Sequence, residues 1–523
     1  MLPKKSNKNN TLTALLILDG FGLADESRVG NAITSKTAPN IFGYMKDYPF
    51  ADLGASGKDV GLFPNQAGNS EAGHLNIGAG RIVPQDLTLI SSAIHDGTFY
   101  KNESFKQALF HVRKYNRAVH IMGLLTDGNS AHAYPEHLYA LLEFFRREKQ
   151  SKVFLHLFTD GRDATPRRAQ QFLHELRGHL LSHEKIATIM GRFYAMDRNK
   201  IWDRTRQAYE AIVGGTGKTA NSAEEALEES YARGDTDEFV IPTVILEDGK
   251  PVGLMQDNDS MFFINARSDR ARQITKAFVQ PDFQRKNMGA FKRSRFPQNT
   301  RFVAMTDFGP DLPGIFTAFP SPDVKSPMAQ SIGEACRQLY ISETEKFAHV
   351  TYFINGGYAE ALNGEDREAV TSVSLRSYAE KPEMNAEELT DKIISYINKD
   401  KYDFFCVNYP NVDMVGHTGD FEAIKLAVQA VDRQVKRIVD EVLAKNGQVL
   451  ITADHGNAEE KIDLKTNEKL TEHSQNPVPF IIVKKDASGI KLKKRGILAD
   501  VAPTLVKLMN IKKADVMTGE SLF

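Results

Sequence analysis

The chain has 523 residues, of which 41% are hydrophobic and 25% are charged, and its 66 Lys+Arg nearly balance its 67 Asp+Glu. This balance lacks the basic excess that marks nucleic-acid-binding proteins and argues against that class of partner. The length suffices for about two to four domains, each large enough for its own hydrophobic core.

Three features bear on where the protein works. Residues 1–10 are basic and polar, and Asp19 interrupts the apolar run that follows, which is a poor match to a secretory signal peptide. No stretch reaches the roughly 18 apolar residues of a membrane span. Cys336 and Cys406 lie among apolar neighbours and are expected to be buried free thiols. We therefore expect a cytoplasmic monomer without a membrane partner, and we assign residues 1–11 no role.

Short apolar runs alternate along the chain with amphipathic helical patterns. This alternation predicts an α/β fold with largely parallel sheets, in which ligands bind beyond the carboxyl ends of the strands. The apolar runs lie within 14–22, 118–132, 153–163, 186–198, 404–417 and 448–457, and the helical patterns at 135–149, 167–181 and 423–447.

The stretch GNSEAGH at 68–74 places a serine, an acid and a histidine among glycines. By itself it is typical of a surface turn capped by Ser70. The alternative is an active-site segment, and the choice depends on the metal-type ligands elsewhere in the chain.

Carboxylates and imidazoles gather in a few short motifs. Each motif alone is also typical of a capping or turn device. Taken together they offer enough ligands for two ions of the Mn²⁺ or Zn²⁺ type, and a two-metal site neutralises a phosphoryl group and activates a hydroxyl such as that of Ser70. The motifs are NVDMVGHTGD with Asp413 and His417, TADHGN with Asp454 and His455, TEHSQNPVPF with His473, and the first predicted strand, which ends at Asp19.

These ligands come from both ends of the chain, which predicts an inserted domain. The proline-containing stretches 80–86 and 318–327 lack periodicity and are interpreted as connections. We expect residues 1–84 and 321–523 to form one domain, residues 85–320 to form an inserted domain, and the connections to act as a double hinge.

The middle segment carries arginines near predicted strand ends. Arginine is the preferred bidentate partner of phosphate and carboxylate, so an anion pocket is a plausible hypothesis beside solvated or structural arginines. His132 is a candidate acid, base or donor, or else an ordinary surface histidine. The pocket candidates are Arg162 with Asp163, Arg192, Arg198, Arg267 and Arg270, and Arg204 and Arg272 are expected to be supports.

Long ordered motifs resemble one family, the cofactor-independent phosphoglycerate mutases of the alkaline phosphatase superfamily. They include LILDGFG, NSEAGHLNIGAGR, DGRDATP, GRFYAMDR, GDTDEFVIPTV, SETEKFAHVTYFINGG, DMVGHTG, TADHGN and NPVPF. The resemblance implies a two-domain α/β enzyme, an alkaline-phosphatase-like domain interrupted by a transferase domain. It implies the glycolytic interconversion of 3-phosphoglycerate and 2-phosphoglycerate without added bisphosphoglycerate.

The resemblance also implies residue roles. Ser70 would become phosphoserine, and Lys346, otherwise an exposed lysine on a polar turn, would stabilise the transferred phosphoryl group. One Mn²⁺ would be held by Asp413, His417 and His473, and the other by Asp19, Ser70, Asp454 and His455. The substrate set would be His132, Arg162, Asp163, Arg192, Arg198, Arg267 and Arg270.

Two positions depart from the family pattern. DGNSAHAYPEH contains one residue more than the family's motif, so His137 competes with His132 for the substrate role. Ala266 stands where the family has a phenylalanine, which removes aromatic bulk beside Arg267.

The expected mechanism is a ping-pong phosphotransfer in which closure of the two domains excludes water and Asp163 serves as base for the glycerate hydroxyls. A phosphatase or phosphopentomutase of the same superfamily is the rival enzyme. A scaffold without activity is the rival of another class, and it predicts a missing ligand where none is missing.

Overall fold

The computed structural model describes residues 10–312 and 314–523, so the expectations about residues 1–9 lie outside the described residues. The chain divides into two compact units: unit 1 comprises Met1–Gln85 and Pro322–Phe523, and unit 2 comprises Asp86–Ser321. Each division lies one residue beyond the boundary expected from the proline-containing connections. In the described part of the chain, no helix has the length and apolar character needed to cross a membrane.

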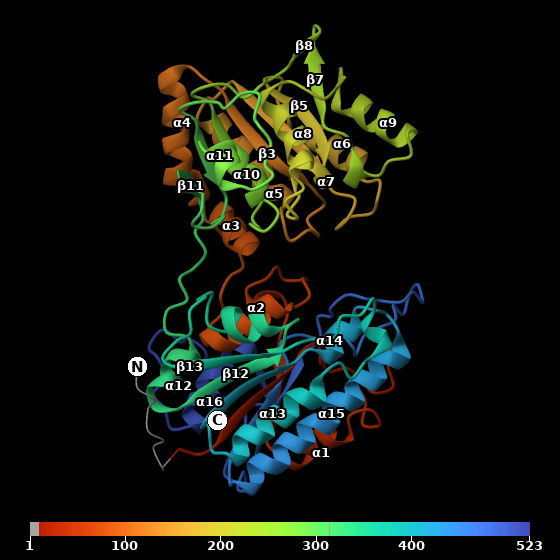
Figure 1. Ribbon diagram of the computed structural model, residues 1–523, viewed down its shortest axis with the longest axis vertical. Helices are drawn as coiled ribbons and strands as arrows, with labels where there is room; N and C mark the ends of the chain where they lie inside the picture. The colour runs from red at the N-terminus through yellow and green to blue at the C-terminus, as the bar shows by residue number, and fades with distance from the viewer. Residues whose placement is uncertain (1–9, 313) are drawn as a thin grey trace. The chain divides into compact units, whose positions relative to one another are not determined.

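Unit 1 contains a mixed, mostly parallel sheet with helices on both faces (Figure 1). Helices α1, α13 and α15 pack together on one face, and α2, α12 and α16 pack together on the other. The elements are β1 (Thr13–Leu18), α1 (Pro39–Asp47), β2 (Phe50–Gly54), α2 (Ser70–Ala79), α12 (Met328–Ala335), β12 (Gln338–Glu343), β13 (Glu365–Val370), α13 (Ala386–Asn398), β14 (Phe404–Tyr409), α14 (Asn411–Gly416), α15 (Phe421–Ala444), β15 (Gln448–Thr452), β16 (Val478–Lys484), β17 (Arg495–Ile497) and α16 (Val501–Leu508).

The strand order in unit 1 is β13-β12-β14-β1-β15-β16-β2-β17. Strands β13, β12, β14, β1 and β15 are parallel to one another, whereas β16 runs antiparallel to both β15 and β2. Every residue of β1, β12 and β14 is buried, because helices cover both faces of a parallel sheet and its strands become continuous apolar runs.

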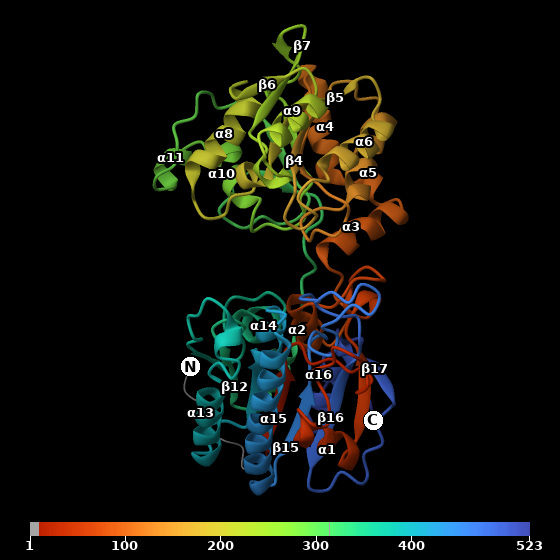
Figure 2. The same cartoon turned by 90° about the vertical axis from the view of Figure 1, so that its right-hand side faces the viewer.

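Unit 2 is built on a second sheet, with strand order β11-β10-β9-β3-β4-β5-β7-β6 and β8 paired to β7 (Figure 2). Only the β5–β7 and β7–β8 pairs are antiparallel. The elements are α3 (Asp86–His95), α4 (Glu103–Tyr115), β3 (Val119–Leu125), α5 (Pro135–Arg147), β4 (Val153–Thr159), α6 (Ala169–His179), β5 (Glu184–Gly191), α7 (Arg192–Ala195), α8 (Trp202–Val213), β6 (Lys218–Ala220), α9 (Ala223–Ala232), β7 (Thr243–Glu247), β8 (Lys250–Pro251), β9 (Ser260–Phe263), α10 (Arg272–Val279), α11 (Phe283–Lys286), β10 (Arg301–Ala304) and β11 (Ile315–Thr317).

The α/β fold with mostly parallel sheets predicted from the sequence is confirmed. Each apolar run contains a strand, and the three helical patterns contain α5, α6 and α15. Cys336 and Cys406 are buried and are not joined to each other by a disulfide, as expected from their apolar neighbours.

Candidate active site

The carboxyl ends of adjacent parallel strands bring three acidic side chains together in unit 1. Asp19 directly follows β1, Asp413 lies in α14 just after β14, and Asp454 lies two residues after β15. Strands β14 and β15 flank β1 in parallel register, so their carboxyl ends share one edge of the sheet. All three carboxylates are buried, which places concentrated negative charge at the position where α/β sheets bind ligands.

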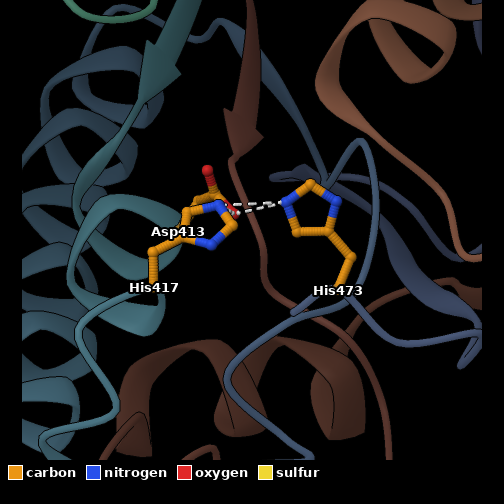
Figure 3. Close-up of side chains that lie close together, drawn as sticks. All are labelled: Asp413, His417 and His473. Atoms are coloured by element: carbon orange, nitrogen blue, oxygen red, sulfur yellow. Dashed lines mark hydrogen bonds and ion pairs between the residues drawn. The ribbon is translucent and has the colours of Figure 1, made fainter. Parts of the chain in front are cut away.

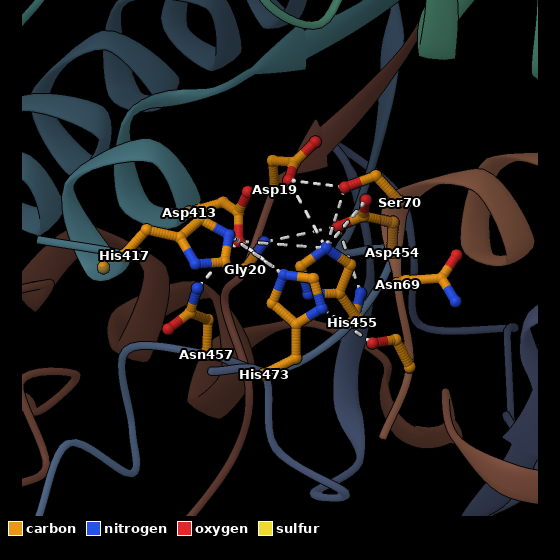
Figure 4. A network of polar contacts seen from close by, with 12 residues as sticks. Asp19, Gly20, Asn69, Ser70, Asp413, His417, Asp454, His455, Asn457 and His473 are labelled. Carbon is orange, nitrogen blue, oxygen red and sulfur yellow. Dashed lines mark hydrogen bonds and ion pairs between the residues drawn. The ribbon is translucent and has the colours of Figure 1, made fainter. Parts of the chain in front are cut away.

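Ser70 is the first residue of α2, and the side chain of Asn69 caps that helix by accepting a hydrogen bond from the Ala72 amide. The surface-turn interpretation is wrong, because Ser70 is only 5% exposed. Its hydroxyl donates to Asp19 Oδ1 at 3.3 Å and lies 2.9 Å from His455 Nε2 (Figure 4). The helix N-terminus therefore presents a single hydroxyl to the acidic edge of the sheet.

Asp413, His417 and His473 form one group that could hold a metal ion (Figure 3). Asp413 Oδ1 lies 3.4 Å from His417 Nε2 and 3.2 Å from His473 Nε2. Asp413 and His417 come from α14 and its end, and His473 comes from the loop that enters β16. Since β16 is antiparallel to β15, this loop reaches the same edge of the sheet.

Asp19, Asp454 and His455 form the second such group. His455 Nε2 lies 3.5 Å from both Asp19 Oδ1 and Asp454 Oδ2. Asp454 Oδ2 accepts no hydrogen bond from the described residues, although His74 Nδ1 is 3.2 Å away. A buried carboxylate oxygen without a donor is costly unless a cation faces it, so this group suits a metal ion.

The two imidazoles of the Asp413 group are oriented for metal coordination. The Nδ1 atoms of His417 and His473 lie 2.8 Å and 2.9 Å from the carbonyl oxygens of Thr471 and Gly68, which accept from N–H groups there. Each Nε2 then carries a lone pair, and the two Nε2 atoms face one another at 3.2 Å. Opposed lone pairs repel, so a cation or proton must lie against them, and backbone-held Nδ1–H groups are the usual partners of histidine metal ligands.

Lys346 joins the two groups. Its ammonium donates to Asp19 Oδ1 at 2.7 Å, to Asp413 Oδ2 at 2.7 Å and to Ser70 Oγ at 2.6 Å. The side chain is buried, so the interpretation as an exposed lysine is wrong. Three buried carboxylates thus face one ammonium. If the imidazoles are neutral, the site keeps a net negative charge that a bound cation would balance.

The pKa shifts follow from this charge distribution. Burial raises the pKa of Asp19, but the Lys346 ammonium and His455 together outweigh it and hold that pKa well below its usual range. Burial lowers the pKa of His455, but Asp454 and Asp19 raise it to about 9. Before a metal binds, the site therefore offsets part of its negative charge by holding a proton on His455, which a metal ion must displace.

In unit 2, as in unit 1, side chains that follow neighbouring parallel strands lie at one edge of the sheet and form a cluster. Strands β9, β3, β4 and β5 are neighbouring and parallel, and each is followed by candidate substrate residues. Buried Arg192, just after β5, donates to Asp160 Oδ1 at 2.6 Å and lies 2.8 Å from Asp163 Oδ2. Asp163 also accepts from Ser130 Oγ at 2.6 Å. Burial raises the pKa of Asp163, but Ser130 and Arg192 bring it below its usual value, so this carboxylate is an ionised proton acceptor.

Asp269 connects the remaining candidates of unit 2. Its carboxylate accepts from Arg198 at 2.7 Å, and it lies 3.3 Å from Arg267 Nε and 3.9 Å from His132 Nδ1. Arg270 lies close enough to Arg198, Arg162 and Arg192 for their positive charges, together with burial, to lower its pKa. The expected supports point elsewhere, since Arg204 pairs with Asp197 and Arg272 with Asp311.

The structure separates the two competing histidines. His132 neighbours Arg192 and Asp163, and burial together with Arg192 lowers its pKa to about 4. His137 lies in α5, fully buried, with Nε2 3.0 Å from Ser91 Oγ. Burial lowers its pKa to about 3. Only His132 faces the arginine cluster.

Several polar residues around the sites were not identified from the sequence. In unit 1, Asn408 donates to Asp19 Oδ2 at 2.7 Å, and Asn457 donates to Asp413 Oδ1 at 2.7 Å. In unit 2, Asp160 and Asp269 orient the arginines. Asn457 lies in the motif TADHGN and Asp160 in the motif DGRDATP, so the sequence offered a signal for both. Asn408 lies in an apolar strand, where the sequence offered no such signal.

Comparison with known proteins gives consistent results over the whole chain. Residues 90–310 match the family described as BPG-independent PGAM N-terminus, and residues 316–515 match type I phosphodiesterase / nucleotide pyrophosphatase. The chain is 45% identical over 512 residues to a 2,3-bisphosphoglycerate-independent phosphoglycerate mutase of Clostridium acetobutylicum, covering 97% of this chain and 98% of that one. The corresponding protein of Acetivibrio thermocellus is 46% identical over 514 residues, covering 98% and 99%.

A solved structure of similar fold also spans both chains. Phosphoglycerate mutase of Leishmania mexicana, crystallised at low cobalt concentration, matches with a TM-score of 0.74 and 27% identity, covering 99% of each chain.

The buried neutral state of His137 predicts a pH dependence of stability. Its pKa is about 3 in the folded protein against 6.5 for an ordinary histidine, so its contribution to stability is present above pH 6.5 and is lost as the pH falls towards 3. His137→Gln, which cannot take up this proton, should gain about 2 kcal/mol of unfolding free energy relative to wild type between about pH 8 and pH 5.

Urea unfolding of both proteins at each pH measures this difference. His174→Gln, on the exposed face of α6, serves as the control and should leave the pH profile unchanged. Parallel profiles for wild type and His137→Gln would contradict the prediction.

Proposed function

Since the chain belongs to the 2,3-bisphosphoglycerate-independent phosphoglycerate mutase family, we propose that it interconverts 3-phosphoglycerate and 2-phosphoglycerate through a phosphoseryl group on Ser70. The observation that supports this proposal best is the set of charged and metal-type groups around the buried Ser70 hydroxyl. Ser70 Oγ lies within hydrogen-bond distance of Lys346 Nζ, Asp19 Oδ1 and His455 Nε2, beside two groups of metal-type ligands.

Asp413, His417 and His473 would hold one divalent cation, and Asp19, Asp454, His455 and Ser70 Oγ the other, with Mn²⁺ the proposed ion. Carboxylates and neutral imidazoles suit such ions, and the absence of cysteine from both groups disfavours a thiolate site. Bound there, two divalent cations would supply positive charge that neutralises a phosphoryl group and lowers the pKa of the attacking hydroxyl.

The chain's own residues would then carry out the transfer. Ser70 Oγ attacks the phosphorus of 3-phosphoglycerate, the bond from phosphorus to the 3-oxygen breaks, and glycerate is left with a hydroxyl at that carbon. Lys346 Nζ, 2.6 Å from Ser70 Oγ, is placed to donate to the phosphoryl oxygens throughout. The 3-oxygen gains one proton for the one that Ser70 loses, so the step is balanced.

In the return step the 2-hydroxyl of glycerate attacks the phosphorus of the phosphoserine, and the bond from phosphorus to Ser70 Oγ breaks. Ser70 regains one proton for the one that the 2-hydroxyl loses, so this step is also balanced. Asp163, which is ionised and held by Ser130 and Arg192, is the proposed base for this hydroxyl. Glycerate itself carries a carboxylate, and guanidinium groups bind carboxylates bidentately. The proposed substrate residues of unit 2 are His132, Arg162, Asp163, Arg192, Arg198, Arg267 and Arg270.

The activity therefore depends on residues of both units. That the enzyme acts in the cytoplasm, as a monomer, stays a prediction from its composition.

Ser70→Ala should abolish mutase turnover, because no other described hydroxyl occupies this position between the two ligand groups. A coupled assay that monitors the conversion of 3-phosphoglycerate to 2-phosphoglycerate measures the rate. A parallel assay for free phosphate distinguishes a mutase from a phosphatase. Ser488→Ala, which removes a surface hydroxyl of unit 1, is the control. A residual rate of about one tenth or more of wild type would refute the covalent route.

Removal of metal should abolish activity, and Mn²⁺ should restore it. We expect metal analysis to find two ions per chain, as the two ligand groups imply. Affinity should fall as the pH is lowered, because the imidazoles must be neutral to coordinate. Full activity in chelator, with less than one metal ion per chain, would contradict this expectation.

Arg270 and Arg272 offer a matched test of the substrate cluster. Arg270→Ala removes a guanidinium that lies beside Arg198 and Arg162, and should raise KM for 3-phosphoglycerate by about tenfold or more, with metal affinity unchanged. Arg272→Ala breaks only the pair with Asp311 and should change KM by less than about twofold. Equal effects of the two substitutions would contradict the assignment.

A further inference from the structure

Unit 1 contains a fourth fully buried carboxylate close to the site, that of Glu459, which belongs to neither metal-type group. Within the described chain, no lysine, arginine or histidine lies at ion-pair distance from it, although burial lowers the pKa of Lys461 and the Glu459 charge opposes that effect. Its direct partners are hydrogen-bond donors, since an ionised carboxylate accepts but does not donate. The identity of its donors therefore tells what it holds in place.

Four donors from three segments of the chain converge on this carboxylate. Oε2 accepts from the backbone amides of Gly22, at 3.1 Å, and Asn457, at 2.9 Å. Oε1 accepts from Ser474 Oγ in a short contact and from Asn476 Nδ2 at 3.0 Å. Two of the donors are backbone amides, so Glu459 fixes the main chain and not merely side chains.

Each of the three segments carries proposed metal ligands. Gly22 lies three residues after Asp19, Asn457 lies two residues after His455, and Ser474 directly follows His473. Asn457 additionally donates through Nδ2 to Asp413 Oδ1 at 2.7 Å. Glu459 thus links segments that supply ligands to both groups.

The packing around Glu459 explains two glycines of the sequence motifs. A Cβ atom at Gly22 or at Gly456 would overlap the Glu459 carboxylate, and at Gly456 it would also overlap Ser474 Oγ. The backbone must approach the carboxylate this closely for its amides to donate, so only glycine fits at these positions. Gly22 of the motif LILDGFG and Gly456 of the motif TADHGN are therefore needed for the same reason, which is the close approach of the backbone to the Glu459 carboxylate.

We propose that Glu459 is a positioning residue for both metal sites, which holds the three ligand-bearing segments at the spacing that two cations require. The inference rests on the proposed two-metal function and extends it to a residue that touches neither ligand group directly. Partners that orient metal ligands typically change metal affinity by about 10- to 100-fold when replaced.

Glu459→Gln tests the proposal because it keeps the size of the side chain and replaces one acceptor oxygen by an N–H donor. That amide would face groups that now donate, Ser474 Oγ and Asn476 Nδ2 or the backbone amides of Gly22 and Asn457. We expect the affinity for Mn²⁺ at both sites to fall by about tenfold or more. We expect excess Mn²⁺ to restore kcat and KM for 3-phosphoglycerate to stay unchanged, because the substrate arginines lie in unit 2.

Glu460→Gln is the matched control. Glu460 is adjacent in sequence and undergoes the same chemical change, but it is partly exposed and pairs with Arg28 at 2.5 Å. It shares only Asn476 with the network, through a bond of 3.0 Å, and contacts none of the backbone amides. Its replacement should change Mn²⁺ affinity by less than about threefold.

The experiment is calorimetric titration of the metal-free full chain with Mn²⁺, with circular dichroism to verify folding. Wild type binding two ions while Glu459→Gln binds them about tenfold more weakly, and Glu460→Gln binds them normally, would support the proposal. Equal affinities for wild type and folded Glu459→Gln would overturn this inference and leave the proposed function standing. Failure of the wild type to bind Mn²⁺ would overturn both.

A milder variant decides the matter if Glu459→Gln does not fold. Ser474→Ala removes one of the four donors and keeps the carboxylate, so it should fold and weaken Mn²⁺ binding by about threefold or more. Unchanged Mn²⁺ affinity in Ser474→Ala, with Glu459→Gln unfolded, would mean that Glu459 stabilises the fold alone and would overturn the proposal.

Discussion

Burial of Asp19, Asp413 and Asp454 at one edge of a parallel sheet is the constraint on which the rest of unit 1 depends. Like charges brought out of water repel strongly, and each must be met by a cation or by hydrogen-bond donors. The Lys346 ammonium meets two of them, and the side chains of Asn408 and Asn457 donate to the same two. The carboxylates keep a net negative charge after these contacts, and this charge makes the edge suitable for the proposed divalent cations.

The proposed nucleophile is held by the same charge balance. A hydroxyl placed between an ammonium and a carboxylate has a donor and an acceptor already in position. Ser70 has this arrangement at the start of α2, where the helix dipole adds further positive potential towards an incoming anion. The glycine-rich stretch around Ser70 is therefore a buried helix start and not a loop.

Unit 2 applies the same topological rule with the opposite sign. There the residues that follow neighbouring parallel strands are mostly arginines, and Asp160, Asp163 and Asp269 hold them apart by ion pairs. Guanidinium groups repel one another, so a cluster of them needs interspersed carboxylates to keep its geometry before an anion binds. The three aspartates are thus part of the proposed anion site, because they keep its arginines in place.

The sequence by itself determined the α/β class, the positions of the main strands and helices, and most ligand-type residues, because strands that end in polar residues are visible as periodicity and motif. The arginines after β4, β5 and β9 were candidates because several of them lie near strand ends or glycine and because guanidinium groups bind anions. Lys346 came only from the resemblance to a family, since a lysine on a polar stretch carries no local signal of burial.

Only the tertiary structure decided which residues share a site. Asn408 lies in an apolar strand, and Glu459 lies in a charged stretch. Nothing in the neighbouring sequence indicates that Asn408 contacts Asp19 or that Glu459 binds three segments of the chain. His132 and His137 could be told apart only by what surrounds them, since His132 lies beside arginines and His137 is buried beside Ser91. The physical reason is the same in each case: side-chain type and spacing are local properties, whereas burial and partnership arise from segments hundreds of residues apart that meet at one sheet edge.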